Sequence, residues 1–436
     1  MAMENATVAG WKLALHHRRK LVDYPSSYWA RSHDRFDTTG TVNLVKLGSG
    51  NDIYTSILPA LERAEEEVIL VTCFWARSET LNQLNQSLRR LSRRAQDEGR
   101  TIKVRICFSS VSLWQKLLHT RSMRGRDYPP SEWQQTLGLP SQQELSGLEL
   151  TVRSIFILPF SVLHPKFIIL DRRQVFLPSC NVSWENWFEG CVEFTGPITD
   201  QFVQFFEAYW TPPSDKHSRS PTIPSTAEAK SRALFLPSAH HALSLFDGIN
   251  APTSPQTPLN VFILSMLGNA TRSIHIQTPN LTSRAVLNEL LATLKRGIDI
   301  RIVTSERLMI LEQLITARTT TARCVKWLSK QHQKLQNDRA RRMSTDREAL
   351  LPPLGKLEIL FYTPRPRTSD PVQSHIKLMI ADGEIIVLGS GNLDRASWVT
   401  SQELGVAVID KAFAQHFKKQ LDIALEGRLR PAYPQQ

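Results

Sequence analysis

The sequence predicts an α/β protein built from two similar α-β-α halves that share one site at their interface. Stretches with helical and strand-like apolar spacing alternate along most of the chain, which is typical of a mixed or parallel sheet covered by helices. The order of these stretches occurs twice. Each copy contains a segment of the form His-x-Lys-x4-Asp, at 164–171 and again at 375–382.

In the first copy, the letters ILPALERAEEEVILVTCFW (57–75) predict an amphipathic helix followed by a buried strand. Gly99 stands where a helix C-terminal stop is expected, and TIKVRICF (101–108) alternates as a strand does. Before that glycine, apolar side chains recur at the spacing of one helical face: Leu81, Leu84, Leu88, Leu91 and Ala95.

The second copy repeats this order. VFILSMLGNATRSIHIQTP (261–279) predicts a helix and a strand, and IDIRIV (298–303) predicts the next strand. Between them a helical stripe ends before Gly297: Val286, Leu287, Leu290, Leu291 and Leu294. Each half then continues with an insertion and a further strand, LELTVRSIF (148–156) or KLEILFY (356–362), before its His-Lys-Asp segment.

The domain boundaries follow from composition. We expect residues 1–40 to form an N-terminal extension, 41–210 the first half and 233–436 the second half. Residues 211–232 are rich in Pro, Ser, Thr and charge and have no hydrophobic period, so they predict a linker.

The second half contains a basic insertion at about 306–355, much of which could be helical. Two interpretations stay open: an ordinary solvated helix face, or a basic flap beside the site that meets phosphate groups. Asp338 is the one acidic residue within its basic run, which comprises Arg318, Arg323, Lys326, Lys330, Lys334, Arg339, Arg341 and Arg342.

The chain ends and cysteines predict an intracellular protein. The first residues, MAMENATVAGWKLALHHRRK, place the basic cluster after the apolar stretch, unlike a secretory signal. A mitochondrial presequence is an alternative, although Glu4 counts against it. The five cysteines form no Cys-x-x-Cys pair, which predicts reduced thiols without a disulfide framework or a zinc site. Because no apolar run approaches the roughly 18–20 residues of a membrane span, we expect a cytoplasmic or peripheral membrane location.

The net charge of +12 favours polyanionic partners. Nucleic acid, an anionic membrane surface and phosphate-bearing substrates all fit this charge, and so does a surface that is basic for solubility alone. The charge therefore does not choose among these partners, and the sequence leaves the oligomeric state unknown.

The two segments HPKFIILD (164–171) and HIKLMIAD (375–382) carry the chemistry. A strand would point the histidine and the lysine two residues later to the same face. Each segment is followed by a strand, a Ser-x-Asn turn and a glutamate before another apolar strand. The corresponding pairs are His164 and His375, Lys166 and Lys377, Asp171 and Asp382, Ser179 and Ser390, Asn181 and Asn392, and Glu189 and Glu403. Glu193 is a competing choice for Glu189.

These residue types suit attack on a phosphodiester. The lysines can neutralise the non-bridging oxygens, and the asparagines and serines can donate hydrogen bonds to them. One neutral imidazole can attack phosphorus, while a second, protonated imidazole can give its proton to the departing oxygen. A carboxylate on the other ring nitrogen fixes the orientation of each histidine. Two such sets meeting at a pseudo-dyad would form one complete site without a metal or another cofactor.

On these residues, the paired segments resemble the HKD motifs of the phospholipase D superfamily, particularly its compact cardiolipin-synthase-like and phospholipase-D-like members. The resemblance covers about 42–425. It implies two fused α/β halves with the cleft between them, and metal-independent phosphodiester hydrolysis or phosphatidyl transfer through a phosphohistidine.

Carried over by position, the resemblance makes His164 the nucleophile and His375 the proton donor. It makes Lys166 and Lys377 phosphate ligands, together with the serines and asparagines of the two turns, and it makes the paired glutamates the residues that orient the histidines. The motif aspartates should be structural, because five residues beyond each lysine they fall on the opposite strand face or in the following turn. The first half departs from the pattern at Pro178, which stands in place of glycine and removes a backbone donor.

The motifs do not separate lipid from nucleic-acid substrates. Apolar and aromatic residues flank them and favour an acyl chain or a membrane interface: Phe156, Leu158, Phe160, Trp184, Trp187, Phe188 and Trp398. The same residues could be core packing or could stack on bases. We therefore predict a phospholipid substrate, with a DNA or RNA nuclease as the second interpretation.

Overall fold

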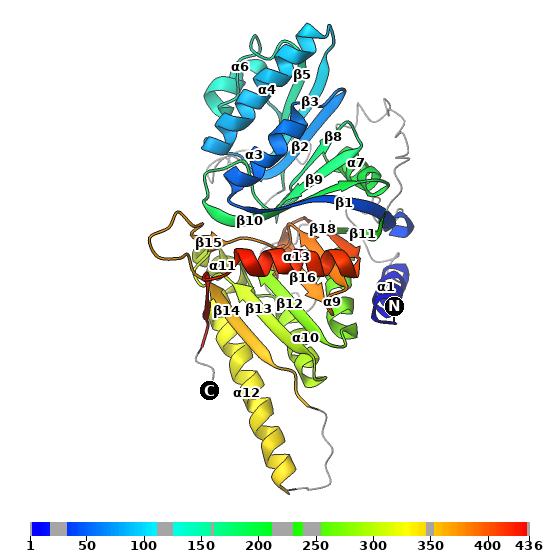
Figure 1. The fold of residues 1–436 in the computed structure, drawn as a ribbon, viewed down its shortest axis with the longest axis vertical. Coiled ribbons are helices and arrows are strands. Elements are labelled where there is room, and N and C mark those ends of the chain that lie inside the picture. The colour runs from blue at the N-terminus through cyan, green and yellow to red at the C-terminus, as the bar shows by residue number, and fades with distance from the viewer. Residues whose placement is uncertain are drawn as a thin grey trace.

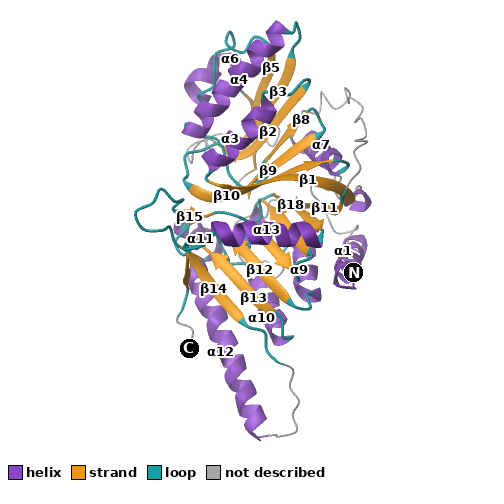
Figure 2. Cartoon of the chain, in the orientation of Figure 1, coloured by secondary structure: helices purple, strands orange, loops and turns teal. Residues whose placement is uncertain are grey.

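The computed structural model describes residues 2–17, 33–110, 125–157, 161–211, 230–238, 254–345 and 353–433. Within these residues the chain forms one mixed sheet of 17 strands and a separate two-stranded ribbon, with helices packed on the sheet (Figures 1 and 2). The ribbon consists of β6 (Phe156–Ile157) and β7 (Ser161–Val162).

The first half has three parallel strands and four antiparallel ones. The parallel strands are β2 (Glu67–Phe74), β3 (Ile102–Ser110) and β5 (Leu148–Ser154), with β4 (Arg126–Asp127) added antiparallel to β5. On the other side of β2 the sheet continues with β8 (Phe167–Leu170), β9 (Gln174–Pro178) and β10 (Trp187–Thr195). The helices are α3 (Gly50–Leu61), α4 (Glu79–Asp97), α6 (Pro130–Glu132), the π-turn η2 (Trp133–Leu137) and α7 (Ile198–Tyr209).

The second half repeats this plan. Its parallel strands are β12 (Ser273–Thr278), β13 (Asp299–Thr304) and β14 (Leu357–Tyr362), with β19 (Leu429–Pro431) antiparallel to β14. The sheet continues from β12 through β16 (Leu378–Ala381), β17 (Ile385–Gly389) and β18 (Glu403–Ile409). The matching helices are α9 (Pro258–Asn269), α10 (Arg284–Lys295) and α13 (Lys411–Ala424). The predicted α/β fold of two similar halves is therefore confirmed.

One strand joins the two halves into a continuous sheet. β1 (Asp37–Gly48) pairs with β10 through residues 41–48 and with β11 (Ser231–Ser238) through residues 37–40. β11 in turn pairs with β18 of the second half. β1 and β11 thus begin inside the ranges expected to be extension and linker; residues 212–229 of that linker lie outside the described residues.

The apolar core also crosses from one half to the other. Phe235 on β11 lies edge-on to Phe202 of α7, with ring centroids 5.1 Å apart, and all three of Phe167, Phe202 and Phe235 belong to one buried cluster that extends into the second half. A second cluster lies within the first half, under α3 and α4. The five cysteines are free thiols. No described helix combines the length and apolar character that crossing a bilayer requires.

The N-terminal extension packs on the second half. Helix α1 (Ala2–His17) lies against α9, followed after the undescribed 18–32 by the short helix η1 (His33–Phe36). The Trp11 side chain is fully buried, and its Nε1 donates to the carbonyl of Pro258 at 2.9 Å. The hydroxyl of Ser265 donates to the carbonyl of Thr7 at 3.0 Å. Full burial of a large apolar side chain contributes about 2–3 kcal/mol, so α1 is part of the fold.

The basic insertion is largely helical, as expected. It contains α11 (Ile310–Ala317) and the long α12 (Thr321–Thr345). Figure 1 shows α12 extending from the second half and pointing away from the first half. Its outer end therefore does not lie beside the interface between the halves, which rules out the interpretation of the whole insertion as a flap over a site there. Its beginning, α11, packs against the π-turn η4 (Ala396–Thr400).

Candidate active site

The two histidine segments lie at the interface between the halves and precede their strands. The predicted strands were to begin at His164 and His375, but β8 begins at Phe167 and β16 at Leu378. The cause is pairing with the opposite half. The amide of His164 donates to the carbonyl of Gln402 at 2.9 Å, and the amide of His375 donates to that of Phe188 at 2.8 Å. The short strand β15 (Gln373–Ser374) likewise pairs with the start of β10.

Each histidine is held by a glutamate from the other half. Nδ1 of His164 lies 2.8 Å from Oε2 of Glu403, and Nδ1 of His375 lies 2.7 Å from Oε1 of Glu189. Gln402 and Phe188, which accept the backbone bonds, immediately precede these glutamates in sequence. The main-chain pairing therefore fixes which carboxylate each ring meets.

The competing glutamate of the first half does not reach a histidine. Oε1 of Glu193 accepts from Gln174 at 2.8 Å and from Asn43 at 3.3 Å, on the far part of β10. Position 189 is thus the structural counterpart of position 403.

The two serines hold the glutamates in place. The Ser179 hydroxyl donates to Glu189 and accepts from the amide of Gly190 at 2.9 Å. The Ser390 hydroxyl donates to Glu403 at 2.5 Å and accepts from the amide of Leu404 at 3.0 Å. Because each hydroxyl gives its single hydrogen to a carboxylate, the predicted donation from these serines to phosphate is replaced by a positioning contact.

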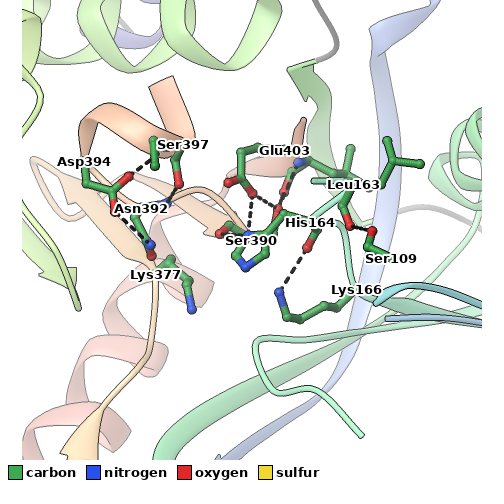
Figure 3. A network of polar contacts seen from close by, with 12 residues as sticks. Ser109, Leu163, His164, Lys166, Lys377, Ser390, Asn392, Asp394, Ser397 and Glu403 are labelled. Atoms are coloured by element: carbon green, nitrogen blue, oxygen red, sulfur yellow. Dashed lines mark hydrogen bonds and ion pairs between the residues drawn. The ribbon is translucent and has the colours of Figure 1, made fainter. Parts of the chain in front are cut away.

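Both lysines face the same space as the histidines. The amine of Lys166 donates to the carbonyl of His164 at 3.0 Å, and that of Lys377 to the carbonyl of His375 at 2.7 Å. Figure 3 shows the two amines beside the His164–Glu403 pair, although they come from different halves. The charge of each lysine acts on both histidines and lowers their pKa values, so the four side chains form one electrostatic unit.

Burial decides the protonation of this unit. It lowers the pKa of His164, and it lowers that of His375 to about 4 although Glu189 opposes the change. It also lowers the pKa of Lys377 to about 7. Burial alone would raise the pKa of Glu189 and Glu403, but their histidine partners hold both below the usual value. At neutral pH each imidazole is therefore neutral, with its hydrogen on Nδ1 facing an ionised carboxylate and a free lone pair on Nε2.

The two asparagines are not equivalent. Oδ1 of Asn181 accepts from the amide of Phe74 at 3.2 Å and from the Thr72 hydroxyl at 3.3 Å, which directs its amide nitrogen elsewhere. Nδ2 of Asn392 instead donates to Asp394 at 3.3 Å, and its Oδ1 is buried without a hydrogen-bond partner in the described part of the chain.

Asp394 is a site residue that sequence reasoning missed. It is buried, accepts from the amide of Ser397 at 2.8 Å, and its negative charge acts on Lys377 (Figure 3). Burial raises the pKa of its carboxyl group. The signal was its place two residues after Asn392, where the first half has Ser183 after Asn181.

The motif aspartates lie outside the site, as expected. Asp171 has a left-handed backbone with φ of 49°, and its carboxylate accepts from three successive amides, those of residues 65–67, at 2.7–3.1 Å. Asp382 has φ of 53° and accepts from the amides of residues 271–273 at 2.8–2.9 Å and from the Thr271 hydroxyl at 2.7 Å. They tie the turns after β8 and β16 to the starts of β2 and β12.

The flanking aromatic residues divide into site and core. The ring of Trp187 lies 4.6 Å from the ring of His375 and covers it. Phe188 stacks on Tyr362, and Trp398 is fully buried, so both are core residues. Trp184 is 70% exposed. The predicted Leu158 and Phe160 lie outside the described residues.

An apolar hollow adjoins Lys377. Its lining includes Leu259, Ile263, Met379 and Leu393, with Gln277 as a polar exception. Both amide atoms of Gln277 are buried and have no hydrogen-bond partner among the described residues. Across the described ranges, no three His, Cys, Asp or Glu side chains gather in the way a metal site requires.

Comparison with known proteins relates the second half of the chain to a known domain. Residues 263–424, which include the second His-Lys-Asp segment, match the family model described as cardiolipin synthase, PLD-like domain. The matched residues lie within the second half of the chain. The match supports an enzyme of the phospholipase D superfamily that acts on phosphodiesters. No curated protein matches the chain significantly.

Three solved structures are similar to the chain. The phosphatidylserine synthase of Haemophilus influenzae Rd KW20 shares its fold, with a TM-score of 0.56 and 15% identity over 92% of this chain and 90% of that one. The polyphosphate kinase of Porphyromonas gingivalis gives a TM-score of 0.47 and 10% identity over 89% of this chain and 48% of that one. The phospholipase D family member Nuc of Salmonella typhimurium gives a TM-score of 0.27 and 21% identity over 40% of this chain and 91% of that one. At these identities the likeness to the synthase concerns the fold.

Proposed function

We propose that this protein cleaves or exchanges a phosphodiester through a phosphohistidine, and that its substrate is a phospholipid. The observation that carries the proposal is the pair of crossed histidine–glutamate contacts beside two buried lysines. Each half supplies one histidine and the carboxylate of the other, so both halves are needed for either ring to be oriented.

In the proposed first step, Nε2 of His164 attacks phosphorus and forms a P–N bond while the P–O bond to the departing alcohol breaks. His375 gives that oxygen a proton, which requires it to be charged beforehand. A bound phosphate anion in this buried site raises the pKa of His375 from its low value near 4, because an opposite charge favours the protonated ring. His164 suits the attacking role because its side chain is 16% exposed, whereas that of His375 is 4% exposed and lies under Trp187.

In the second step, water or an alcohol attacks the phosphohistidine. His375, now neutral, removes the proton of the incoming oxygen, and the P–N bond breaks to restore His164. Water gives hydrolysis and a lipid alcohol gives phosphatidyl transfer. Lys166 and Lys377 neutralise the non-bridging oxygens in both steps, and the amide nitrogen of Asn181 adds a donor.

The surroundings of the site favour a lipid. The indole of Trp187 covers His375, so one wall beside the phosphate position is aromatic and suits an apolar substrate better than a polar sugar. The basic α12 is the observation that favours the second candidate, a nuclease, because it suits a polyanion. Its outer end points away from the first half and therefore does not continue the site (Figure 1).

The catalytic test uses a soluble chromogenic phosphodiester. His164→Ala and His375→Ala should each abolish turnover, whereas Glu193→Gln, at the glutamate that contacts neither ring, should retain it. A chelator should leave the rate unchanged, and a phosphorylated peptide containing residue 164 should be trapped by rapid denaturation. Full turnover in either alanine variant would contradict the mechanism.

The substrate test compares lipid with nucleic acid. Liposomes supplied with a primary alcohol should yield a phosphatidyl-alcohol. Rapid shortening of single-stranded DNA or RNA, without any lipid product, would replace the lipid proposal by the nuclease.

A further inference from the structure

Helix α11 presents its apolar side chains outward. Of its eight residues, Gln313 is the buried one, at 3% exposure. Leu311 and Ile315 are 72% and 54% exposed, and Ile310 and Leu314 are also exposed. A surface helix ordinarily buries its apolar stripe and exposes its polar residues. In α11 this arrangement is reversed.

The exposed apolar residues form one patch. Eleven large hydrophobic residues are exposed among the described residues, and five of them fall within the seven positions 309–315. We call these five residues the α11 patch: Met309, Ile310, Leu311, Leu314 and Ile315. Isolated exposed hydrophobic residues are common, whereas a contiguous group marks an interaction surface.

The patch is held firmly. Oε1 of Gln313 accepts from the amide of Thr321 at 2.6 Å and from its hydroxyl at 3.0 Å, and Nε2 donates to the carbonyl of Leu308 at 2.6 Å. Buried polar contacts of this kind fix the helix, so its exposed face is not the result of a loosely attached segment.

Two further contacts place the patch next to the active site. The guanidinium of Arg395 donates to the carbonyl of Thr316 at 2.8 Å, and Arg395 stands three residues after Asn392. The amide of Leu281 donates to the Thr321 hydroxyl at 3.0 Å, and Leu281 bridges to Leu393. Figure 1 shows α11 near β15, at the level where the two halves meet.

Basic residues flank the patch on both sides in the sequence. Arg307, Arg318, Arg323 and Lys326 are exposed. Residues 307–345 contain nine lysines and arginines against two acidic residues. An apolar centre with a basic border matches the interface of an anionic bilayer, where acyl chains lie below negatively charged headgroups. A protein partner would need an acidic border to match the same surface.

We propose that the α11 patch docks on the surface of an anionic phospholipid bilayer and brings the active site to the headgroups. The functional role of this docking, which is to bring the active site to its substrate, rests on the lipid substrate proposed above. Binding of the patch to a bilayer is a separate property that can be measured by itself. A second copy of this chain is the competing occupant, and the experiment below separates the two.

The experiment measures vesicle binding of the full-length chain by co-sedimentation. Vesicles contain phosphatidylcholine alone or with phosphatidylglycerol. We expect binding to the anionic vesicles and a loss of affinity of about 10-fold or more in the double variant Leu311→Asp/Ile315→Asp. Ile423→Asp is the matched control, because Ile423 is 63% exposed on α13 and should bind as the wild type does. Neither variant should change turnover of a soluble phosphodiester.

Each outcome decides the proposal. Undiminished vesicle binding by the double variant would overturn it, and so would a wild type that ignores vesicles but forms a dimer which the double variant dissociates. If the double variant loses vesicle binding but the wild type does not act on lipid, the docking surface is upheld and the lipid substrate is overturned. If the protein turns over lipid in vesicles and the double variant does so equally well, the lipid substrate is upheld and the docking surface is overturned.

Discussion

Replacing Lys377 by methionine should stabilise the folded protein while removing catalytic turnover. The lysine is 4% exposed, and burial lowers the pKa of its amine to about 7 from an ordinary value of 10.5. A methionine has a similar length and no charge to bury, so it keeps the packing of the stem and removes the desolvated ammonium.

The size of the effect follows from the pKa. At pH 6 the amine is charged in both the folded and the unfolded chain, and the lowered pKa corresponds to a destabilisation of about 5 kcal/mol at 1.36 kcal/mol per unit. The attraction of Lys377 for Glu189 is already contained in the lowered pKa. The variant also loses the hydrogen bond to the carbonyl of His375, worth about 1 kcal/mol. A net gain of about 4 kcal/mol remains, which for 436 residues raises Tm by roughly 4 °C.

The dependence on pH tests the cause. As pH falls from about 10.5 to about 7, the unfolded lysine takes up a proton and the folded one does not, so the wild type loses stability over this range. The variant has no such group. Thermal unfolding followed from pH 6 to pH 10 should therefore show the largest advantage of the variant at pH 6 and a shrinking one towards pH 10. Lys418→Met, at a half-exposed lysine of α13, is the control. A variant less stable than the wild type at pH 6, or an advantage that stays constant with pH, would refute the reasoning.

Three further outcomes are expected. Glu189→Gln should lower kcat by roughly 10²–10⁴-fold and shift the ring ¹⁵N signals of His375 while leaving those of His164 in place; the opposite pattern would show that the glutamates do not cross. Asp382→Ala should lower the free energy of unfolding by about 3 kcal/mol, because three backbone amides lose their acceptor, and a loss below about 1 kcal/mol in a denaturant titration would contradict this. The value of kcat/KM for a soluble phosphodiester should fall at low pH, below the lowered pKa of His164, where the attacking ring becomes charged, and above pH about 7, where Lys377 loses its charge; a plateau from pH 7 to pH 10 would argue against a role for that charge.

Much of the fold could be predicted because it is encoded locally. The leucine stripes of α4 and α10 and the glycines that follow them, at φ of 65° for Gly99 and 89° for Gly297, give both helices and their ends. The start of β8 could not be predicted in this way. Residues 164–166 have strand-like letters, but their hydrogen-bond partner is Gln402, far along the chain. Pairing across that distance leaves no periodic signal.

The sequence indicated which residue types form the candidate site, but only part of how their side chains contact one another. Both glutamates were expected to orient histidines, yet nothing in two equivalent motifs indicates that each glutamate serves the ring of the other half. The hydroxyl of Ser179 was expected to face phosphate. In the structure it donates its hydrogen to the carboxylate of Glu189, which lies on the next strand, β10. Asp394 was missed because the comparison of the halves looked for what they share, and this residue is where they differ.

The strand that links the halves limits how the enzyme can move. β1 belongs to both ladders, and the two histidine segments each cross to the opposite side. Separating the two halves would break main-chain hydrogen bonds at several places at once. We therefore expect the two histidines and two lysines to keep their spacing while a substrate binds and a product leaves, so that any opening of the site involves side chains and not a hinge between the halves.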